Sequence, residues 1–164
     1  MNVRPARIGD LESLRDLLSP SRAFQPSSLR AAVESGSCFL AEINGQIIGC
    51  GVLSYDFFDR GFIKFLHARP EYRRRAVASA LLSALEVECN TTVIFTSTNS
   101  SNVPMQKLLA KLGYQASGSV EGLDPGDPEL FFRKLLGPKE SRSRASGTMH
   151  PVLLRPESHK RSCP

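Results

Sequence analysis

An apolar strand, an arginine-rich turn and an amphipathic helix follow one another between Phe62 and Glu88, and this order constrains the fold more than any other stretch. Pro70 has a fixed φ and forces Arg69 out of the helical region, so we expect the strand to end near Ala68. Apolar residues then recur at every fourth position, which is typical of a helix with one buried face. These residues are Val77, Leu81 and Leu85.

The turn between this strand and helix has the composition of an anion-binding site. It reads Arg73-Arg74-Arg75-Ala76-Val77-Ala78, three cations followed by small residues. The first turn of a helix carries unpaired N–H groups and about half a positive charge, and small side chains let a phosphate approach them. The sequence therefore predicts a phosphate-binding turn, and the alternative is an arginine patch that faces solvent or nucleic acid.

Length and composition indicate one globular domain. The chain has 164 residues, of which 41% are hydrophobic and 23% charged, enough to bury a sizeable core. It has no run of about 18 apolar residues and no signal-like start, so we expect neither a membrane span nor secretion. Cys38, Cys50 and Cys89 lie in apolar patterns without metal-binding spacing, which predicts buried free thiols, a cytoplasmic location and no metal.

The formal charge of +5 is concentrated in the last part of the chain. From Gly137 onward there are six Lys and Arg and two acids, a net charge of +4. This segment is rich in Ser, Arg and Pro and has little periodicity, so we expect a domain over 1–136 and a flexible basic tail over 137–164. Because the tail carries most of the charge, nucleic-acid binding by the domain is weakly supported.

Local patterns predict further elements on both sides of the turn. Asp10 is expected to cap a helix over residues 11–18. Asn44-Gly45 predicts a type I′ hairpin, and Gly49 and Gly51 in its second strand indicate a bulge or a close approach. The expected strands are 2–8, 38–43, 46–55, 62–68, 92–96, 114–117 and 129–135, with a turn at 59–61 and helices over 28–35, 77–88 and from Pro104 to Gly113.

This order of elements and two linked motifs resemble the GNAT acetyltransferase superfamily over roughly residues 1–136. The turn at 73–78 is similar to the family's coenzyme-A signature Gln/Arg-x-x-Gly-x-Gly/Ala, and Asn102 precedes a helix that ends in Leu112-Gly113-Tyr114, as is frequent in the family. The resemblance implies a single α/β (α+β) domain, with a mixed, largely antiparallel central sheet flanked by helices. It implies transfer of an acetyl group from acetyl-CoA to the primary amine of a small molecule or peptide, without a metal, and a possible homodimer.

The resemblance also implies where acetyl-CoA would bind. The arm of the cosubstrate would enter between two diverging strands, and the diphosphate would lie at the turn. The implied binding residues are Leu66, His67, Ala68, Arg73, Arg74, Arg75, Ala76, Val77, Ala78, Asn102 and Met105. Ala76 stands where the family usually has glycine. If this position requires a positive φ, alanine there would cost about 1–2 kcal/mol.

The catalytic groups are less defined by the sequence. Many relatives use a Tyr as general acid where this chain has Leu109, so Tyr114 and Tyr55 are the substitute candidates, and water is an alternative proton source. His67, Asp56 and Glu129 are candidate bases, and Asp56 and Asp59 could attract a cationic amine. Phe24 is either a core-edge residue or an acceptor contact. Ala76 and Leu109 depart from the family pattern, and they favour an alternative function, a coenzyme-A-binding sensor or interaction module with little catalysis.

Overall fold

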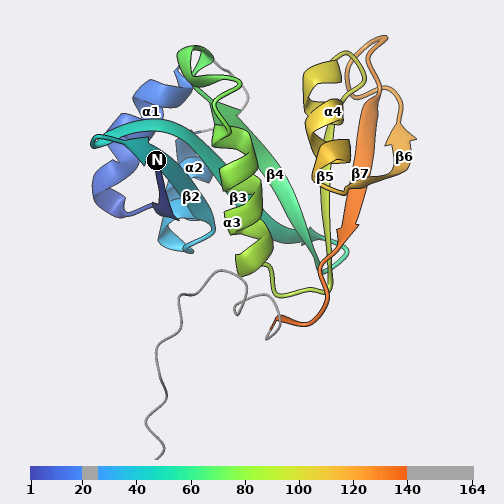
Figure 1. Cartoon of the computed structure of the whole chain (residues 1–164), viewed down its shortest axis with the longest axis horizontal. Coiled ribbons are helices and arrows are strands. Elements are labelled where there is room, and N and C mark those ends of the chain that lie inside the picture. The colour runs from blue at the N-terminus through green and yellow to red at the C-terminus, as the bar shows by residue number, and fades with distance from the viewer. Residues whose placement is uncertain (20–25, 140–164) are drawn as a thin grey trace, which may run out of the picture.

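The computed structural model describes residues 1–19 and 26–139, in which a seven-stranded sheet has the order β1-β2-β3-β4-β5-β7-β6 (Figure 1). Neighbouring strands are antiparallel except β4 and β5, which are parallel. The predicted mixed, largely antiparallel sheet is confirmed. The strands are β1 (Asn2–Pro5), β2 (Cys38–Ile43), β3 (Gln46–Phe57), β4 (Arg60–Ala68), β5 (Val93–Asn99), β6 (Gln115–Val120) and β7 (Glu129–Leu135).

Helices cover both faces of this sheet. Leu81 and Leu85 of α3 are fully buried in a core with β2, β3 and β5, and Leu109 of α4 belongs to the same core. Leucines of α1 and α2 form a second core on the other face, against β2 and β3. The helices are α1 (Leu11–Leu18), α2 (Pro26–Glu34), α3 (Val77–Glu88) and α4 (Val103–Lys111), with short 3-10 turns η1 (Ile8–Asp10) and η2 (Pro70–Tyr72).

The β2–β3 hairpin has the turn and the close approach that the sequence predicts. Asn44 and Gly45 both have positive φ, +50° and +78°, as a type I′ turn requires. Gly51 marks a close approach, because a Cβ atom there would lie 2.9 Å from Leu85 Cδ1 of α3. The absence of side chains at Gly49 and Gly51 therefore lets α3 pack directly on β3.

Several predicted boundaries were wrong. The first strand ends at Pro5, because the chain turns into η1 and leaves Ile8 exposed. The hairpin before β4 turns at Phe58 and Asp59, both at positive φ, and not at 59–61. The other differences are α2, which begins at Pro26, β5, which continues to Asn99, and β6, which spans Gln115–Val120.

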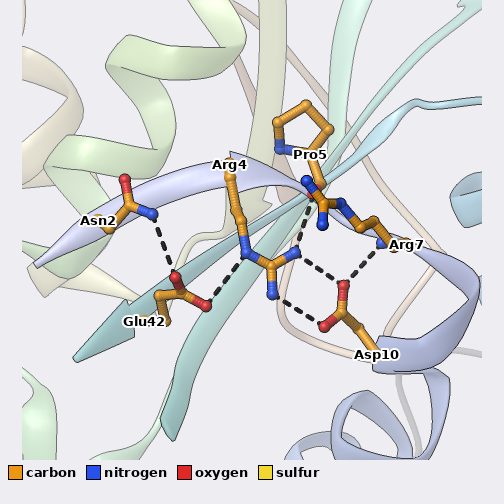
Figure 2. Close-up of polar contacts among 6 residues, drawn as sticks. All are labelled: Asn2, Arg4, Pro5, Arg7, Asp10 and Glu42. Carbon is orange, nitrogen blue, oxygen red and sulfur yellow. Dashed lines mark hydrogen bonds and ion pairs between the residues drawn. The ribbon is translucent and has the colours of Figure 1, made fainter. Parts of the chain in front are cut away.

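Asp10 stands at the N-cap of α1, as predicted, but its carboxylate does not cap the helix. It accepts two hydrogen bonds from the Arg4 guanidinium, at 2.8 and 2.9 Å, and one from the Arg7 N–H at 2.7 Å (Figure 2). The Arg4 hydrogen bonds hold the pKa of Asp10 below its usual value. Arg4 also donates to Glu42 on β2, so this cluster joins β1, β2 and η1.

The three cysteines within the described residues, Cys38, Cys50 and Cys89, are buried and free, as predicted. Burial raises the pKa of the Cys38 thiol to about 12, so this sulfur is unreactive at neutral pH. No helix in residues 1–19 and 26–139 combines the length and apolar character needed to cross a membrane. Most of the predicted tail and Phe24 lie outside the described residues.

Candidate functional site

The parallel strands β4 and β5 pair over three residues and then separate (Figure 1). The pairing runs from Gly61–Ile94 to Ile63–Thr96, where the Thr96 hydroxyl donates to the Ile63 carbonyl at 3.0 Å. Beyond this point β4 continues to Ala68 and pairs only with β3, while β5 continues to Asn99 and pairs only with β7. Two backbone edges therefore face a gap between the strands.

A β-bulge in β4 coincides with the point of separation. Val52 of β3 faces Phe65, but the next residue, Leu53, faces Ile63, so Lys64 is an extra residue in β4. A bulge bends its strand and increases the local twist, which directs the rest of β4 away from β5. After the bulge, Phe65 packs toward α1 and α2, and the alternate residues Leu66 and Ala68 pack toward α3.

Two adjacent cavities lie along this separation. The larger, which we call the α3 cleft, has a volume of about 740 Å³ and lies between the end of β4, the start of α3 and α4. The smaller, the β4–β5 gap, has a volume of about 210 Å³ and is lined by both strands and Glu129 of β7. Leu66, Asn102 and Met105 line both cavities, so one elongated ligand could occupy them together.

All of the predicted cofactor-binding residues except Arg75 line the α3 cleft. The guanidinium of Arg75 instead lies over the ring of Tyr72, 5.5 Å from its centroid. Asn102 caps α4, accepting a hydrogen bond from Met105 N–H at 3.3 Å, and donates to Thr98 at 2.9 Å. The structure thus brings the predicted residues together, while their binding role stays a prediction.

The wall formed by the turn before α3 is suited to an anion. Hydrogen bonding along α3 begins with Ala80 N–H, which donates to Ala76 O at 2.9 Å. In the described chain, no carbonyl or side chain accepts from the N–H groups of Val77, Ala78 and Ser79. These donors point toward the helix start. The charged residues that line this cleft, Arg73, Arg74 and Lys111, are all cationic, and no acidic residue from 1–19 or 26–139 lines it.

Ala76 adopts the left-handed conformation, with φ +61° and ψ +11°. Arg74 also has a φ of +61°. The turn therefore needs a positive φ at the position where the sequence signature has glycine, and Ala76 carries the expected cost of about 1–2 kcal/mol. The same backbone shape directs successive N–H groups toward one side, as in other anion-binding turns.

His67 is among the residues that line the α3 cleft, and its imidazole lies on the face of β4 that it shares with Phe65. Its imidazole stacks parallel to the Phe65 ring, with centroids 6.3 Å apart and planes 5° apart. Burial, with the charges of Arg73 and Arg69, lowers the pKa of His67. The imidazole is therefore neutral at pH 7 and able to accept a proton.

The other catalytic candidates lie elsewhere. Tyr114 is 5% exposed, and its hydroxyl has no hydrogen-bond partner among the described residues. Burial raises the pKa of Tyr114, and the Glu86 charge adds to this shift. The Tyr55 hydroxyl accepts from Asn90 N–H at 2.8 Å, at the end of α3 far from its start. Neither tyrosine lines either cavity.

Of the three acidic candidates, Glu129 lines a cavity and Asp56 and Asp59 do not. Asp56 is largely exposed and pairs with Lys64, with Nζ and Oδ2 3.7 Å apart. Asp59 is exposed in the hairpin turn, whereas Glu129 lines the β4–β5 gap. Leu109, at the position where the resemblance implied the general acid, is fully buried in the core. No group of three or more His, Cys, Asp or Glu within residues 1–19 and 26–139 is placed to hold a metal ion.

Some cleft residues were missed by the sequence reasoning. Leu108 and Lys111 follow Met105 at three-residue steps along α4, so one helical face lines the α3 cleft. This spacing was present in the sequence and would have identified them. Tyr72 and Ser79 also line the cleft. Tyr72 is positioned by a hydrogen bond that it donates to Gln46, which only the tertiary structure reveals.

Comparison with known proteins gives this geometry a family context. A protein described as an acetyltransferase from Pectobacterium atrosepticum is 34% identical over 93 residues, which cover 52% of this chain and 65% of that protein, so the match spans just under two thirds of that relative. The crystal structure of a GNAT-family acetyltransferase from Bacillus cereus has 34% identity and a TM-score of 0.78, covering 82% of this chain and 96% of the other.

A more distant structure shares the fold. The Salmonella typhimurium protein yncA, solved with its cofactor acetyl-CoA, has 16% identity and a TM-score of 0.70 and covers 94% of this chain and 99% of its own. The sequence model of the acetyltransferase (GNAT) family matches residues 11–114, well over half of the chain. With the separated β4 and β5 strands and the basic turn before α3, this match establishes that the chain belongs to the acetyltransferase (GNAT) family.

Proposed function

We propose that this protein transfers an acetyl group from acetyl-CoA to a primary amine. The observation that carries the proposal is the separation of β4 and β5 beside a helix start with unpaired N–H groups and cationic walls. The acetyl-CoA bound to the distant yncA structure supports the same cosubstrate here. Acetyl-CoA would supply an acetyl group activated as a thioester.

The residues of the chain fit this cosubstrate in two places. The free N–H groups of Val77–Ser79 and the side chains of Arg73 and Arg74 suit a diphosphate. The facing edges of Phe65–Ala68 and Ser97–Asn99 offer backbone donors and acceptors to an extended chain that carries amide groups. Such strand addition satisfies backbone groups that otherwise bond only to water.

His67 is the residue that we assign to proton removal from the amine. An alkylamine has a pKa near 10, so at pH 7 only about one molecule in a thousand is nucleophilic, which is a deficit of roughly 4 kcal/mol. The neutral imidazole of His67 stacks on Phe65 on the face of β4 opposite α3 and can accept this proton. We assign protonation of the leaving thiolate to water, because Tyr114 and Tyr55 line neither cavity.

The second candidate function is binding of coenzyme A without efficient catalysis. Leu109, which stands where many relatives have a tyrosine, is fully buried and could not donate a proton to the cleft. A sensor or partner-binding module would retain the anion-binding wall and lose only turnover. The two functions therefore differ in thiol release and not in coenzyme-A affinity.

A thiol-release assay with acetyl-CoA and a panel of amines tests the proposal. The panel contains alkylamines, arylamines, polyamines, amino acids and peptides with free N-termini. Amine-dependent thiol release that falls in the His67→Gln variant supports acetyl transfer. Tight coenzyme-A binding by calorimetry without thiol release for any amine would favour the binding module instead.

A further inference from the structure

Four phenylalanines form one continuous aromatic surface on the sheet face opposite α3. Phe57 is at its centre, with ring centroids 5.0 Å from Phe62, 5.3 Å from Phe95 and 5.6 Å from Phe131. The rings come from β3, β4, β5 and β7. We call this set the aromatic floor. All four side chains are half-buried, so they remain partly accessible to a ligand.

Strand alternation places the floor beside the β4–β5 gap. On β7, Leu130 and Phe132 pack toward α3, so Phe131 and Glu129 occupy the opposite face two residues apart. Ser97 faces Phe131 across the strands and Asn99 faces Glu129. The floor therefore leads along β5 and β7 directly to the gap, which Ser97, Asn99 and Glu129 line.

The helices of this face leave the floor open. In the described part of the chain, α1 packs mainly on β3 and α2 mainly on β2. Their leucines cover Cys50 and Val52 and extend to Phe65 at the edge of β4. An apolar surface that adjoins a cavity and stays accessible is a common feature of ligand sites.

Glu129 lies at the end of the floor, and its carboxylate is unpaired within the described part of the chain. Its carboxylate makes no hydrogen bond or ion pair with any residue in 1–19 or 26–139. The nearby acids are occupied, because Asp124 accepts from Asn99 at 2.8 Å and Asp127 accepts from Ser100 and Ser101. Lys64, the cation that lines the same gap, pairs with Asp56.

We propose that the acceptor is a primary amine attached to an apolar alkyl or aryl group, with its ammonium bound by Glu129 and its apolar part on the aromatic floor. This inference rests on the proposed function, since it names the acceptor class of the same site. A carboxylate next to a ring surface complements a molecule with one cationic end and one apolar end. Polyamines would place further charges on the phenylalanines, and amino acids would bring their own carboxylate next to that of Glu129.

Calorimetric titration of amines into the protein saturated with coenzyme A tests this specificity directly. The probes are ethylamine, butylamine, hexylamine and phenethylamine, with 2-methoxyethylamine as the polar match for butylamine and spermidine as the polycation. Affinity should rise by about fourfold for each methylene buried on the floor. Butylamine should therefore bind more tightly than 2-methoxyethylamine, and phenethylamine more tightly than spermidine.

Two variants with matched controls separate the two parts of the site. Glu129→Gln should weaken phenethylamine binding about tenfold or more, as expected for loss of a charge-assisted hydrogen bond, while Glu121→Gln in the exposed β6–β7 connection should not. Phe131→Ser should abolish the gain per methylene, and Leu135→Ser, at an exposed position of the same strand, should preserve it. Unchanged coenzyme-A affinity shows that each variant is folded.

Binding is read without catalysis, so the two proposals fail separately. Amine binding with the predicted order but no thiol release would contradict acetyl transfer and leave this inference in place. Equal affinity for polar and apolar amines, tighter binding of spermidine, or no binding of any amine would overturn the inference. Unchanged phenethylamine affinity in Glu129→Gln would also overturn it.

Discussion

Gly49 of β3 and Val77, the first residue of α3, are so close that no side chain fits between them. A Cβ atom on Gly49 would lie 2.8 Å from Val77 Cγ1 and 2.8 Å from the His67 carbonyl oxygen. This contact fixes the start of α3 against the end of β4. The position of the unpaired N–H groups therefore depends on a glycine in a different strand.

Gly49→Ala should displace the start of α3 and weaken coenzyme-A binding. Overpacking of this kind destabilises a protein by about 1–3 kcal/mol, and the backbone carbonyl of His67 cannot move freely. Gly9→Ala is the control, because Gly9 has no atom within 4 Å of an added Cβ and does not have a positive φ. Thermal unfolding and calorimetry check both variants, and equal behaviour of the two would contradict the role given to Gly49.

Ala76→Gly should raise the free energy of unfolding by about 1 kcal/mol. Glycine removes the strain of a left-handed alanine, and this gain exceeds the entropy that glycine adds to the unfolded chain. Ala80→Gly, one turn further into α3, should instead destabilise by about 1 kcal/mol. Denaturant unfolding measures both, and a loss of stability in Ala76→Gly would show that the strain is absent.

Arg73 and Arg74 should matter for coenzyme-A affinity, and Arg75 should not. The first two line the α3 cleft, whereas Arg75 lies over the Tyr72 ring. Replacing Arg73 and Arg74 by Ala should weaken binding by about tenfold and reduce its dependence on salt. Arg75→Ala is the matched control in the same calorimetric titrations. An equal loss in the control would mean that the turn acts only through its total charge.

The pH dependence of turnover should report His67. Because burial and two arginines lower its pKa, kcat/KM should hold to below pH 6.5 and fall only as pH decreases through the lowered pKa. The unfolded chain binds this proton more readily, so stability also decreases as pH falls below about 6.5. His67→Gln should reduce kcat/KM by about 10²–10⁴ and remove this acid limb. An unchanged pH profile in the variant would assign the limb to another group.

Much of the fold follows from local patterns in the sequence. Pro70, the stripe of α3 and the Asn44-Gly45 turn each act over a few residues, and the structure confirms the elements that they predict. The separation of β4 and β5 has a different cause, a bulge at Lys64 that only the register with β3 reveals. That separation was expected from the family resemblance and could not be derived from the residues of β4 alone.

The candidate site divides in the same way, into parts that contiguous residues predict and parts that depend on the tertiary structure. The predicted phosphate-binding turn depends on contiguous residues, and the structure collects nearly all of them in one cleft. The catalytic candidates depend on which way distant side chains point. Nothing in the sequence around Tyr114 indicates that it is buried. In the structure its side chain is buried, and Lys134 Nζ lies over the Tyr114 ring, 5.5 Å from the centroid. Glu129 and Phe131 acquire their setting only when β7 pairs with β5.

Hydrogen–deuterium exchange with and without acetyl-CoA tests the central claim most directly. Binding along the separated strands and at the start of α3 predicts slower exchange for the amides of Val77, Ala78 and Ser79 and for those of Phe65–Ala68. The β1–β2 pair, none of whose residues lines either cavity, serves as the internal reference and should not change. Unchanged exchange at the start of α3 in saturating acetyl-CoA, or protection confined to other elements, would contradict the account.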